Sequence, residues 1–165
     1  MTKSIVSFGI LVLCFFVIGC GYGSVRVPTG AMQPTIPIDS FVVWDKSAYL
    51  GENPVSRFDL VLHTVPLNAL REKRGITENE HYIFRVIGLG GEEIEVKKGI
   101  VFVNKVQLEH PFEINPSNDN FGPIRIPDNE FFLLGDNRSE SEDSRYWKPA
   151  TIGKDRIIGK VVKIF

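Results

Sequence analysis

A run of 22 residues without a charge, from Ser4 to Val25, is the most constraining feature of the sequence. Lys3 precedes it and Arg26 follows it, and its centre, Ile5–Ile18, is almost entirely apolar. Because charged side chains are expensive in hydrocarbon and about 20 helical residues span a bilayer core, such a run is typical of a membrane or signal helix. A buried core helix is disfavoured, since a single small domain seldom hides so long an uncharged segment.

Three interpretations of this segment stay open. It is an uncleaved membrane anchor, a secretory signal that is removed, or a lipoprotein signal. In the third case Val17-Ile18-Gly19-Cys20 is the lipobox and Cys20 becomes the lipidated N-terminus. All three place the rest of the chain outside the cytoplasm. We therefore divide the chain into an N-terminal membrane anchor or lipoprotein-type signal, residues 1–23, and one domain, residues 24–165, on the extracytoplasmic side of the cell membrane.

Composition and charge limit what the domain can be. Hydrophobic residues make up 43% and charged residues 24% of the 165 residues, which suits one folded domain. Lys and Arg number 19 against 20 acidic residues, so the basic surplus that nucleic-acid binding requires is missing. Cys14 and Cys20 lie in the N-terminal segment, and His63, His81 and His110 are scattered. The sequence therefore predicts neither a disulfide framework nor a metal site.

Short runs of β-branched and aromatic residues follow the N-terminal segment. They are bounded by turn residues and predict β-strands, and no helical hydrophobic period appears after Val25. Residues 93–97 alternate strictly between polar and apolar, and Lys98-Gly99 then turns the chain into the next run, which predicts a hairpin. The predicted strands are 41–44, 60–62, 82–87, 93–97, 100–103, 131–134 and 157–165.

These strands predict an all-β domain. Several short strands need their edges protected, so we expect a partly closed barrel. Two polar stretches, residues 71–80 and 110–121, interrupt the strands and are predicted to run over the surface.

Three segments look like more than scaffold. They read VPTGAMQPT, YIFRVIGLGGE and LGDNRSESEDSRYW, at residues 27–35, 82–92 and 134–147. Taken singly, the first is an ordinary linker, the second a buried strand with a glycine turn, and the third a solvated charged loop. However, the density of Asp, Arg and Ser in the third segment also suits a hydrogen-bonded network beneath an active site.

Taken together and in this order, the three segments resemble the type I signal peptidases of bacteria, which are membrane-anchored serine peptidases that remove signal sequences. The resemblance extends over essentially the whole chain. It implies a signal-peptidase-like, partly closed β-barrel after one N-terminal transmembrane or signal helix. The most specific matching positions are Met32, Pro34, Thr35, Gly135-Asp136-Asn137-Arg138, Ser141 and Asp143-Ser144-Arg145.

The resemblance also implies a Ser/Lys dyad that this chain lacks. In the family, the serine before the motif methionine attacks the scissile carbonyl, and the lysine before the motif arginine is the general base. Here the nucleophile position holds Ala31 and the base position holds Phe84, while Thr29 keeps the hydroxyl that helps to hold the oxyanion. A serine needs a nearby base to become an effective nucleophile, and neither alanine nor phenylalanine can take these roles. We therefore expect little or no peptidase activity.

Neighbouring side chains do not replace the missing pair. His81 lies three residues before Phe84 on the predicted strand, and this odd offset places it on the opposite face. Thr29 could present its hydroxyl, but the sequence offers no base to activate it. A naturally degenerate relative is a simpler explanation of the double replacement than an engineered knockout.

Supporting roles follow from the same resemblance. Ser141 orients the lysine in the family, and Arg85, Asp143 and Arg145 form a supporting ion-pair network, in which we expect Arg85 to pair with Asp143. The family binds small residues at the first and third positions before the cut, with the substrate paired to edge strands. The groove for that peptide would be lined by Val27, Pro28, Met32, Ile36, Tyr82 and Ile83.

Three functions are compatible with these features. The favoured one is an inactive signal peptidase homologue that keeps a groove for signal peptides or preprotein segments at the outer face of the membrane. The alternatives are an active signal peptidase with a rebuilt dyad, and an anchored partner that docks on an active signal peptidase or on the secretion machinery. The expected partners are membrane lipid together with such peptides or such a peptidase. No nucleic acid, cofactor or metal is expected.

Overall fold

The structure, a computed structural model, describes residues 21–51, 53–65, 80–112 and 114–165. None of the helices in these ranges has the length and hydrophobicity that a membrane span requires. Residues 1–20 lie outside them, so the anchor, the signal and the lipobox at Cys20 stay predictions. Part of the first predicted surface stretch, residues 71–79, also lies outside them.

The described residues are mostly strands, joined by loops and three short 3₁₀ helices. The helices are η1 (Lys46–Tyr49), η2 (Ser144–Tyr146) and η3 (Lys154–Arg156). The strands are β1 (Tyr22–Arg26), β2 (Phe41–Asp45), β3 (Leu60–Thr64), β4 (His81–Gly88), β5 (Glu93–Lys97), β6 (Ile100–Val103), β7 (Val106–Gln107), β8 (Phe121–Arg125), β9 (Glu130–Leu134), β10 (Ile152–Gly153) and β11 (Ile157–Ile164).

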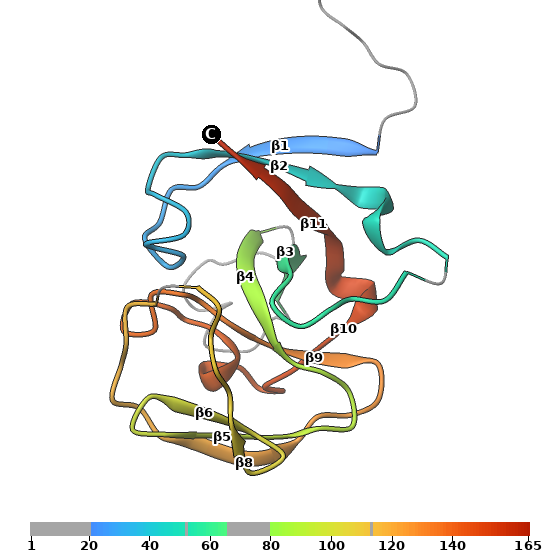
Figure 1. Cartoon of the computed structure of the whole chain (residues 1–165). Coiled ribbons are helices and arrows are strands. Elements are labelled where there is room, and N and C mark those ends of the chain that lie inside the picture. Colours follow the sequence, from blue (N-terminus) through green and yellow to red (C-terminus); the bar gives the residue numbers. More distant parts are fainter. Residues whose placement is uncertain (1–20, 52, 66–79, 113) are drawn as a thin grey trace, which may run out of the picture.

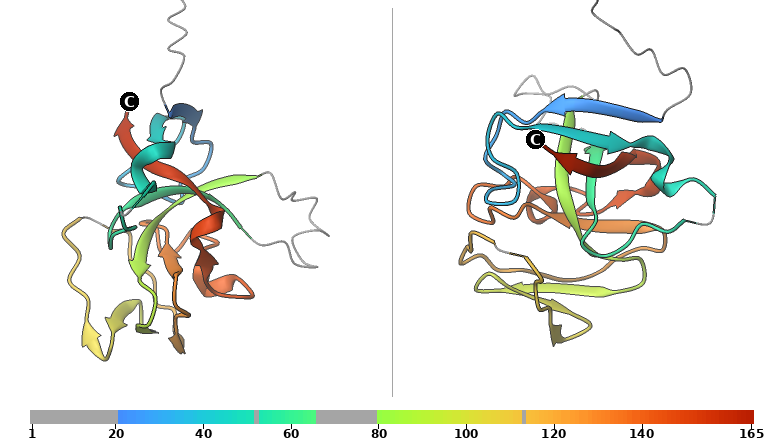
Figure 2. Two further views of the ribbon diagram at one scale, coloured as in Figure 1. Left: turned by 90° about the vertical axis from the view of Figure 1, so that its right-hand side faces the viewer. Right: turned by 45° about the horizontal axis from the view of Figure 1, so that its top comes forward.

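These strands form two antiparallel sheets (Figure 1). The larger sheet has seven strands in the order β1-β2-β11-β3-β4-β9-β10, and the smaller has four in the order β7-β6-β5-β8. The larger sheet curls strongly, and the smaller sheet lies at the end of the molecule away from β1 and β2 (Figures 1 and 2). The predicted all-β, partly closed barrel is therefore confirmed.

Each predicted strand is present. The turn between β5 and β6 is formed by Lys98 and Gly99, whose φ angles are +49° and +79°, as a two-residue hairpin with positive φ at both positions requires. Glycine is also needed there for space, because a Cβ on Gly99 would lie 2.0 Å from the carbonyl oxygen of Ser117. The hairpin prediction is confirmed.

Four strands were not predicted, namely β1, β7, β8 and β10. β1 pairs with β2 from Tyr22 opposite Asp45 to Arg26 opposite Phe41, so the end of the uncharged run, including Tyr22 and Gly23, belongs to a sheet. A short edge strand with polar and glycine residues carries little alternation, which is why the sequence pattern does not reveal it.

Strands β4 and β9 join two hydrophobic clusters because alternate side chains point to opposite faces. On β9, Leu133 belongs to the cluster enclosed by the larger sheet, whereas Phe132 and Leu134 belong to the cluster that packs against the smaller sheet. On β4, Phe84 belongs to the first cluster and Ile87 to the second. This alternation separates the surroundings of Phe84 from those of its neighbour Arg85.

Candidate functional site

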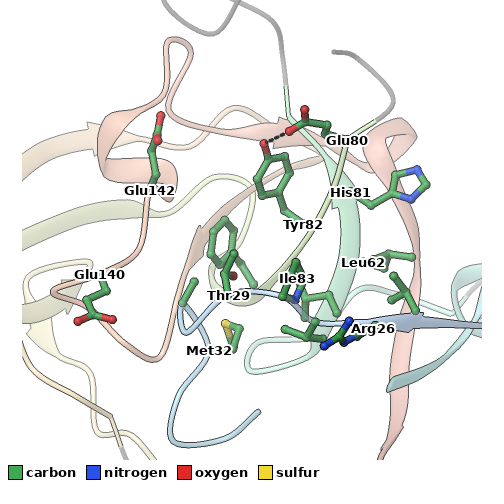
Figure 3. A pocket seen from close by; sticks show the side chains of 15 residues that line it. Arg26, Thr29, Met32, Leu62, Glu80, His81, Tyr82, Ile83, Glu140 and Glu142 are labelled. Carbon is green, nitrogen blue, oxygen red and sulfur yellow. Dashed lines mark hydrogen bonds between the residues drawn. The ribbon is translucent and has the colours of Figure 1, made fainter. Parts of the chain in front are cut away.

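A pocket of about 480 Å³ lies between the segment that follows β1 and the first half of β4 (Figure 3). β3 accompanies β4 from His81 to Arg85, whereas β9 pairs only with the second half of β4, from Arg85 to Gly88, so the pocket lies beyond the end of β9. The lining residues are Val25, Arg26, Val27, Pro28, Thr29, Ala31, Met32, Leu62, Glu80, His81, Tyr82, Ile83, Phe84, Glu140 and Glu142.

Ala31 lies on a segment that is tightly held. The side chain of Met32 next to it is buried in the core, and the backbone amide of Ile36 donates to the carbonyl of Met32 at 2.9 Å. The carbonyl oxygen of Ala31 accepts hydrogen bonds from the backbone amide of Asn137 at 3.0 Å and from the hydroxyl of Ser141 at 2.9 Å. The loop after β9 therefore fixes the backbone at Ala31, where the sequence motif predicts the nucleophile position.

Phe84 forms part of an aromatic cluster below the pocket. Its ring stacks on Tyr82, with centroids 6.3 Å apart and planes at 17°. It also packs against His63 and Trp147, at centroid distances of 5.5 and 5.9 Å. Phe84 is buried among these rings, so the predicted base position is apolar.

The polar side chains that line the described pocket include neither a serine nor a lysine. The Tyr82 hydroxyl donates to Glu80 at 2.8 Å, and the His81 side chain points away from Tyr82 (Figure 3). No hydrogen bond connects the exposed Thr29 hydroxyl, within the described ranges, to any side chain that could accept its proton.

Arg85, on the other face of β4, forms a two-point ion pair with Asp136. Its Nε and Nη2 atoms donate to the two carboxylate oxygens at 2.9 and 2.6 Å, and both side chains are buried. The expected pairing of Arg85 with Asp143 is therefore wrong. The register explains the difference, because Arg85 lies opposite Leu134, and Asp136 follows two residues later on the same side.

Further contacts complete the surroundings of this pair. The hydroxyl of Thr35 donates to Asp136 at 2.5 Å, and Nη1 of Arg85 donates to the carbonyl of Phe58 at 3.0 Å. The guanidinium lies 3.7 Å from the centre of the Phe112 ring. Thr35 belongs to the first of the three motif segments and Asp136 to the third. Both therefore contact the buried guanidinium of Arg85.

Asp143 pairs instead with Arg145, two residues further along the chain. Nε and Nη2 of Arg145 donate to its carboxylate oxygens, both at 2.8 Å, and the backbone amide of Gly135 donates to it at 3.1 Å. Burial raises the pKa of Asp143, while the hydrogen bonds from Arg145 and Gly135 oppose that rise. Burial alone would lower the pKa of Arg145, but its contacts with Asp143 outweigh burial and raise it. The pair holds the loop after β9 in place.

Two further groups beside this network have shifted pKa values. Burial lowers the pKa of Arg138 to about 10, so that its guanidinium is still cationic at neutral pH. Burial, together with the nearby charge of Arg138, lowers the pKa of His110 to about 4. His110 is therefore neutral at pH 7.

The structure brings together most of the residues that were predicted to line a peptide groove. Val27, Pro28, Met32, Tyr82 and Ile83 all line the pocket. Ile36 does not, because its side chain is fully buried in the core.

Sequence reasoning missed the acidic residues of the pocket, Glu80, Glu140 and Glu142. In the sequence, Glu140 and Glu142 are two of several charged residues in one loop, and nothing distinguishes them from the others. No pattern around Glu80 indicates that it lies at a pocket. Among the described residues, no group of three or more His, Cys, Asp or Glu side chains could hold a metal ion.

Comparison with known proteins shows the family. The family described as "Signal peptidase, peptidase S26" matches residues 1–165. The chain belongs to this signal peptidase family. It is 32% identical over 134 residues to the probable signal peptidase I-2 of Synechocystis sp., a match that covers 81% of this chain and 58% of the relative. It is 34% identical over 139 residues to signal peptidase I of Leptolyngbya laminosa, covering 84% of this chain and 66% of the relative.

A solved member of the family has a similar fold. The crystal structure of a signal peptidase I from Enterococcus faecalis V583 matches with a TM-score of 0.50 and 24% sequence identity, covering 67% of this chain and 97% of that one. The chain spans 58% and 66% of the lengths of the two relatives above, which are longer proteins.

Proposed function

We propose that this protein is a signal peptidase I homologue that binds extended peptide segments of preproteins, signal peptides included, at the outer face of the membrane without cleaving them. One observation carries this proposal. Ala31 and Phe84, which occupy the two dyad positions of the family, line the same pocket. This observation supports the proposal that the pocket is the family's site without its two working groups.

The chemistry supports an inactive site. Hydrolysis of a peptide bond by this family's route needs a hydroxyl nucleophile and a base that accepts its proton. A base must come within hydrogen-bond reach of the nucleophile, roughly 3 Å. Phe84 fills the base position with an aromatic ring that packs on Tyr82 and Trp147, so a water molecule does not easily replace the missing amine there.

The arrangement of strands supports peptide binding. The pocket runs along the first half of β4, beyond the end of β9, and the segment from Val25 to Met32 forms its other wall. Apolar side chains line both walls, Val27 and Met32 on one and Ile83 on the other. An extended peptide that lies beside a strand gains main-chain hydrogen bonds, and pockets for its side chains select its sequence.

The relatives support the kind of peptide and the place. Two are named signal peptidases, and a third, 29% identical over 136 residues, is thylakoidal processing peptidase 1 of Arabidopsis thaliana. We infer that the peptide bound here is a signal sequence or the adjoining preprotein segment. The uncharged segment that precedes β1 would hold the domain near membrane lipid on the extracytoplasmic side.

Binding of a labelled peptide tests the proposal. The full-length chain in detergent is titrated with a fluorescent peptide that spans a signal-peptide cleavage region with alanine at the first and third positions before the cut. We expect saturable binding that Thr29→Trp abolishes, because Thr29 is exposed in the pocket and a large ring there occupies its volume. Asn118→Trp, at an exposed position that does not line the pocket, is the matched control. Absence of saturable binding, or unchanged binding by Thr29→Trp, would contradict the proposal.

A further inference from the structure

Arg138, in the loop after β9, carries a guanidinium group that is almost completely buried. Only 2% of the residue is exposed, and its Nε atom donates to the carbonyl of Gly135 at 3.0 Å. The Nη1 and Nη2 atoms are buried as well, and no group among the described residues accepts a hydrogen bond from either of them. Both terminal amino groups of a buried cation are therefore left without an acceptor from this part of the chain.

The neighbouring contacts hold this guanidinium inside the protein. The backbone amide of Arg138 donates to the carbonyl of Asn115 at 2.8 Å, and its carbonyl accepts from Nη2 of Arg145 at 2.6 Å. The backbone is fixed by these two bonds, and the side chain is fixed by the bond from Nε to Gly135. The terminal nitrogens are thus kept in the interior, where water does not screen their charge.

The carboxylates of the same network are used by the other two guanidinium groups. Both oxygens of Asp136 accept from Arg85, and both oxygens of Asp143 accept from Arg145. Asp119, the third carboxylate, also binds Arg145 and is partly exposed. Burial of a cation that has no hydrogen-bonded anion is costly, so the remaining guanidinium calls for an anion of its own.

His110 supplies a second buried nitrogen near Arg138. Its Nδ1 atom has no hydrogen-bond partner among the described residues, and the charge of Arg138 is close enough to contribute to the lowered pKa of His110. In the tautomer that is protonated at Nδ1, this atom is a donor like the guanidinium nitrogens. Residues 109–112, which carry the imidazole, are exposed or partly exposed, so a small local opening admits an ion from solvent.

We propose that the terminal nitrogens of Arg138 bind a small monovalent anion, with chloride as the expected ligand. A guanidinium presents its N–H groups as a fork that holds an anion by two hydrogen bonds. One guanidinium balances one negative charge, and the nearby carboxylates of Asp136 and Asp143 disfavour a second one, so phosphate and sulfate do not suit this place. Arg138 does not line the peptide pocket, and this inference does not depend on the proposed function.

The dependence of stability on chloride tests the proposal. The full-length chain in detergent is dialysed against gluconate, an anion too large for a buried place. Chloride then replaces gluconate up to about 0.2 M at constant ionic strength, so that screening is unchanged. A ligand that binds only the folded state stabilises it by mass action, so the melting temperature measured by circular dichroism should rise by about 3 °C and then level off.

A second measurement detects the bound ion itself. Chloride that exchanges between solvent and a protein site has a broadened NMR signal, so the unmodified chain should broaden the chloride signal. Bromide has the same charge and a similar size, and it should reverse the broadening by competing for the same nitrogens. This measurement does not require any variant to fold.

Variants connect both signals to the guanidinium. Arg138→Met removes the charge and the donors but keeps an apolar stem, and it should lose the thermal response and the broadening. Arg138→Lys keeps the charge but loses the fork, so it should need about fivefold more chloride for the same response. Arg125→Met, at an exposed position on β8, is the matched control and should respond like the unmodified chain.

Two results would overturn the proposal. The first is an unmodified chain whose melting temperature is equal in gluconate and chloride and which leaves the chloride signal unbroadened, because a water molecule or a protein group is then the acceptor. The second is an Arg138→Met variant that keeps the full response, because the anion then binds elsewhere. Neither result affects peptide binding at the pocket.

Discussion

The hydroxyl of Ser141 lies 2.9 Å from the carbonyl oxygen of Ala31 and 2.8 Å from that of Asn137. By resemblance this serine orients a catalytic lysine, but here its hydrogen bonds tie the loop after β9 to the segment before Met32. A Cβ on Gly135 would lie 1.7 Å from the Ser141 hydroxyl oxygen and 2.6 Å from the Ala31 carbonyl, so only glycine allows this close approach. Ser141 therefore has a structural role that does not depend on catalysis.

Ser141→Ala should lower the stability of the domain. Loss of the hydroxyl leaves the partly buried Ala31 carbonyl with one hydrogen-bond partner fewer, which costs about 1–2 kcal/mol in the free energy of unfolding. Urea denaturation followed by tryptophan fluorescence measures the change. Ser24→Ala, on the exposed side of β1, is the control and should stay within about 0.5 kcal/mol. A Ser141→Ala variant as stable as that control would contradict the structural role.

Asp136→Asn should lower the stability of the domain more than Ser141→Ala does. Asp136 is fully buried and holds both Nε and Nη2 of Arg85, and removing one partner of a buried pair typically costs about 3–5 kcal/mol. The exposed Asp128→Asn serves as the control. Thermal unfolding by circular dichroism is the measurement, and equal melting temperatures for the two variants would show that this pair does not stabilise the fold.

His110 should make stability depend on pH in the acid range. Its folded pKa is lowered to about 4 by burial and by Arg138, from the ordinary value of 6.5. Between these values the unfolded chain binds a proton that the folded chain does not, so the free energy of unfolding falls as the pH falls from 6.5 towards 4. Because the side chain is only half buried, we expect the free energy of unfolding to fall by about 1–2 kcal/mol over this range, which is less than the full pKa difference would give. His110→Gln should flatten this part of the curve, and superimposable curves for both proteins would rule the effect out.

The strands could be predicted because their signals are local. Alternation in β5 and the Lys98-Gly99 turn are readable over a few residues, and these elements form as expected. β8 could not be found in this way, because Gly122 and Pro123 interrupt its pattern, and pairing with β5 makes it a strand. Tertiary context overrides weak local preference at such places.

The site was predicted less completely for a related reason. The positions of Ala31 and Phe84 follow from the motifs, and the structure places both on one pocket. The partner of Arg85 depends on the register between β4 and β9, which no local pattern specifies. The acidic lining combines Glu80 with Glu140 and Glu142, about 60 residues later in the sequence, and no local pattern shows that such distant residues line one pocket.

Restoring both dyad groups should restore some peptidase activity. Ala31→Ser with Phe84→Lys places a hydroxyl and an amine on the same pocket, and the surrounding rings should keep the lysine dry enough to be neutral near pH 8. Cleavage of a preprotein should therefore rise with pH. Each single variant should be inactive, because nucleophile and base act as a unit.

The gain is expected to be modest, since the pocket is packed around Phe84 and a lysine must reach the new serine within roughly 3 Å. Circular dichroism of the double variant serves as the folding control. A well-folded double variant that never cleaves would mean that more than the two dyad groups has been lost.

Turnover of a preprotein by the unmodified, full-length chain is the most direct test of the central claim, that the site binds but does not cleave. The chain is incubated in detergent with a preprotein carrying alanine at the first and third positions before the cut, and the products are followed by mass spectrometry. With Ala31 and Phe84 at the dyad positions, we expect no cleavage above a control without the chain. Cleavage at the signal-peptide junction that increases with the concentration of the chain would contradict it.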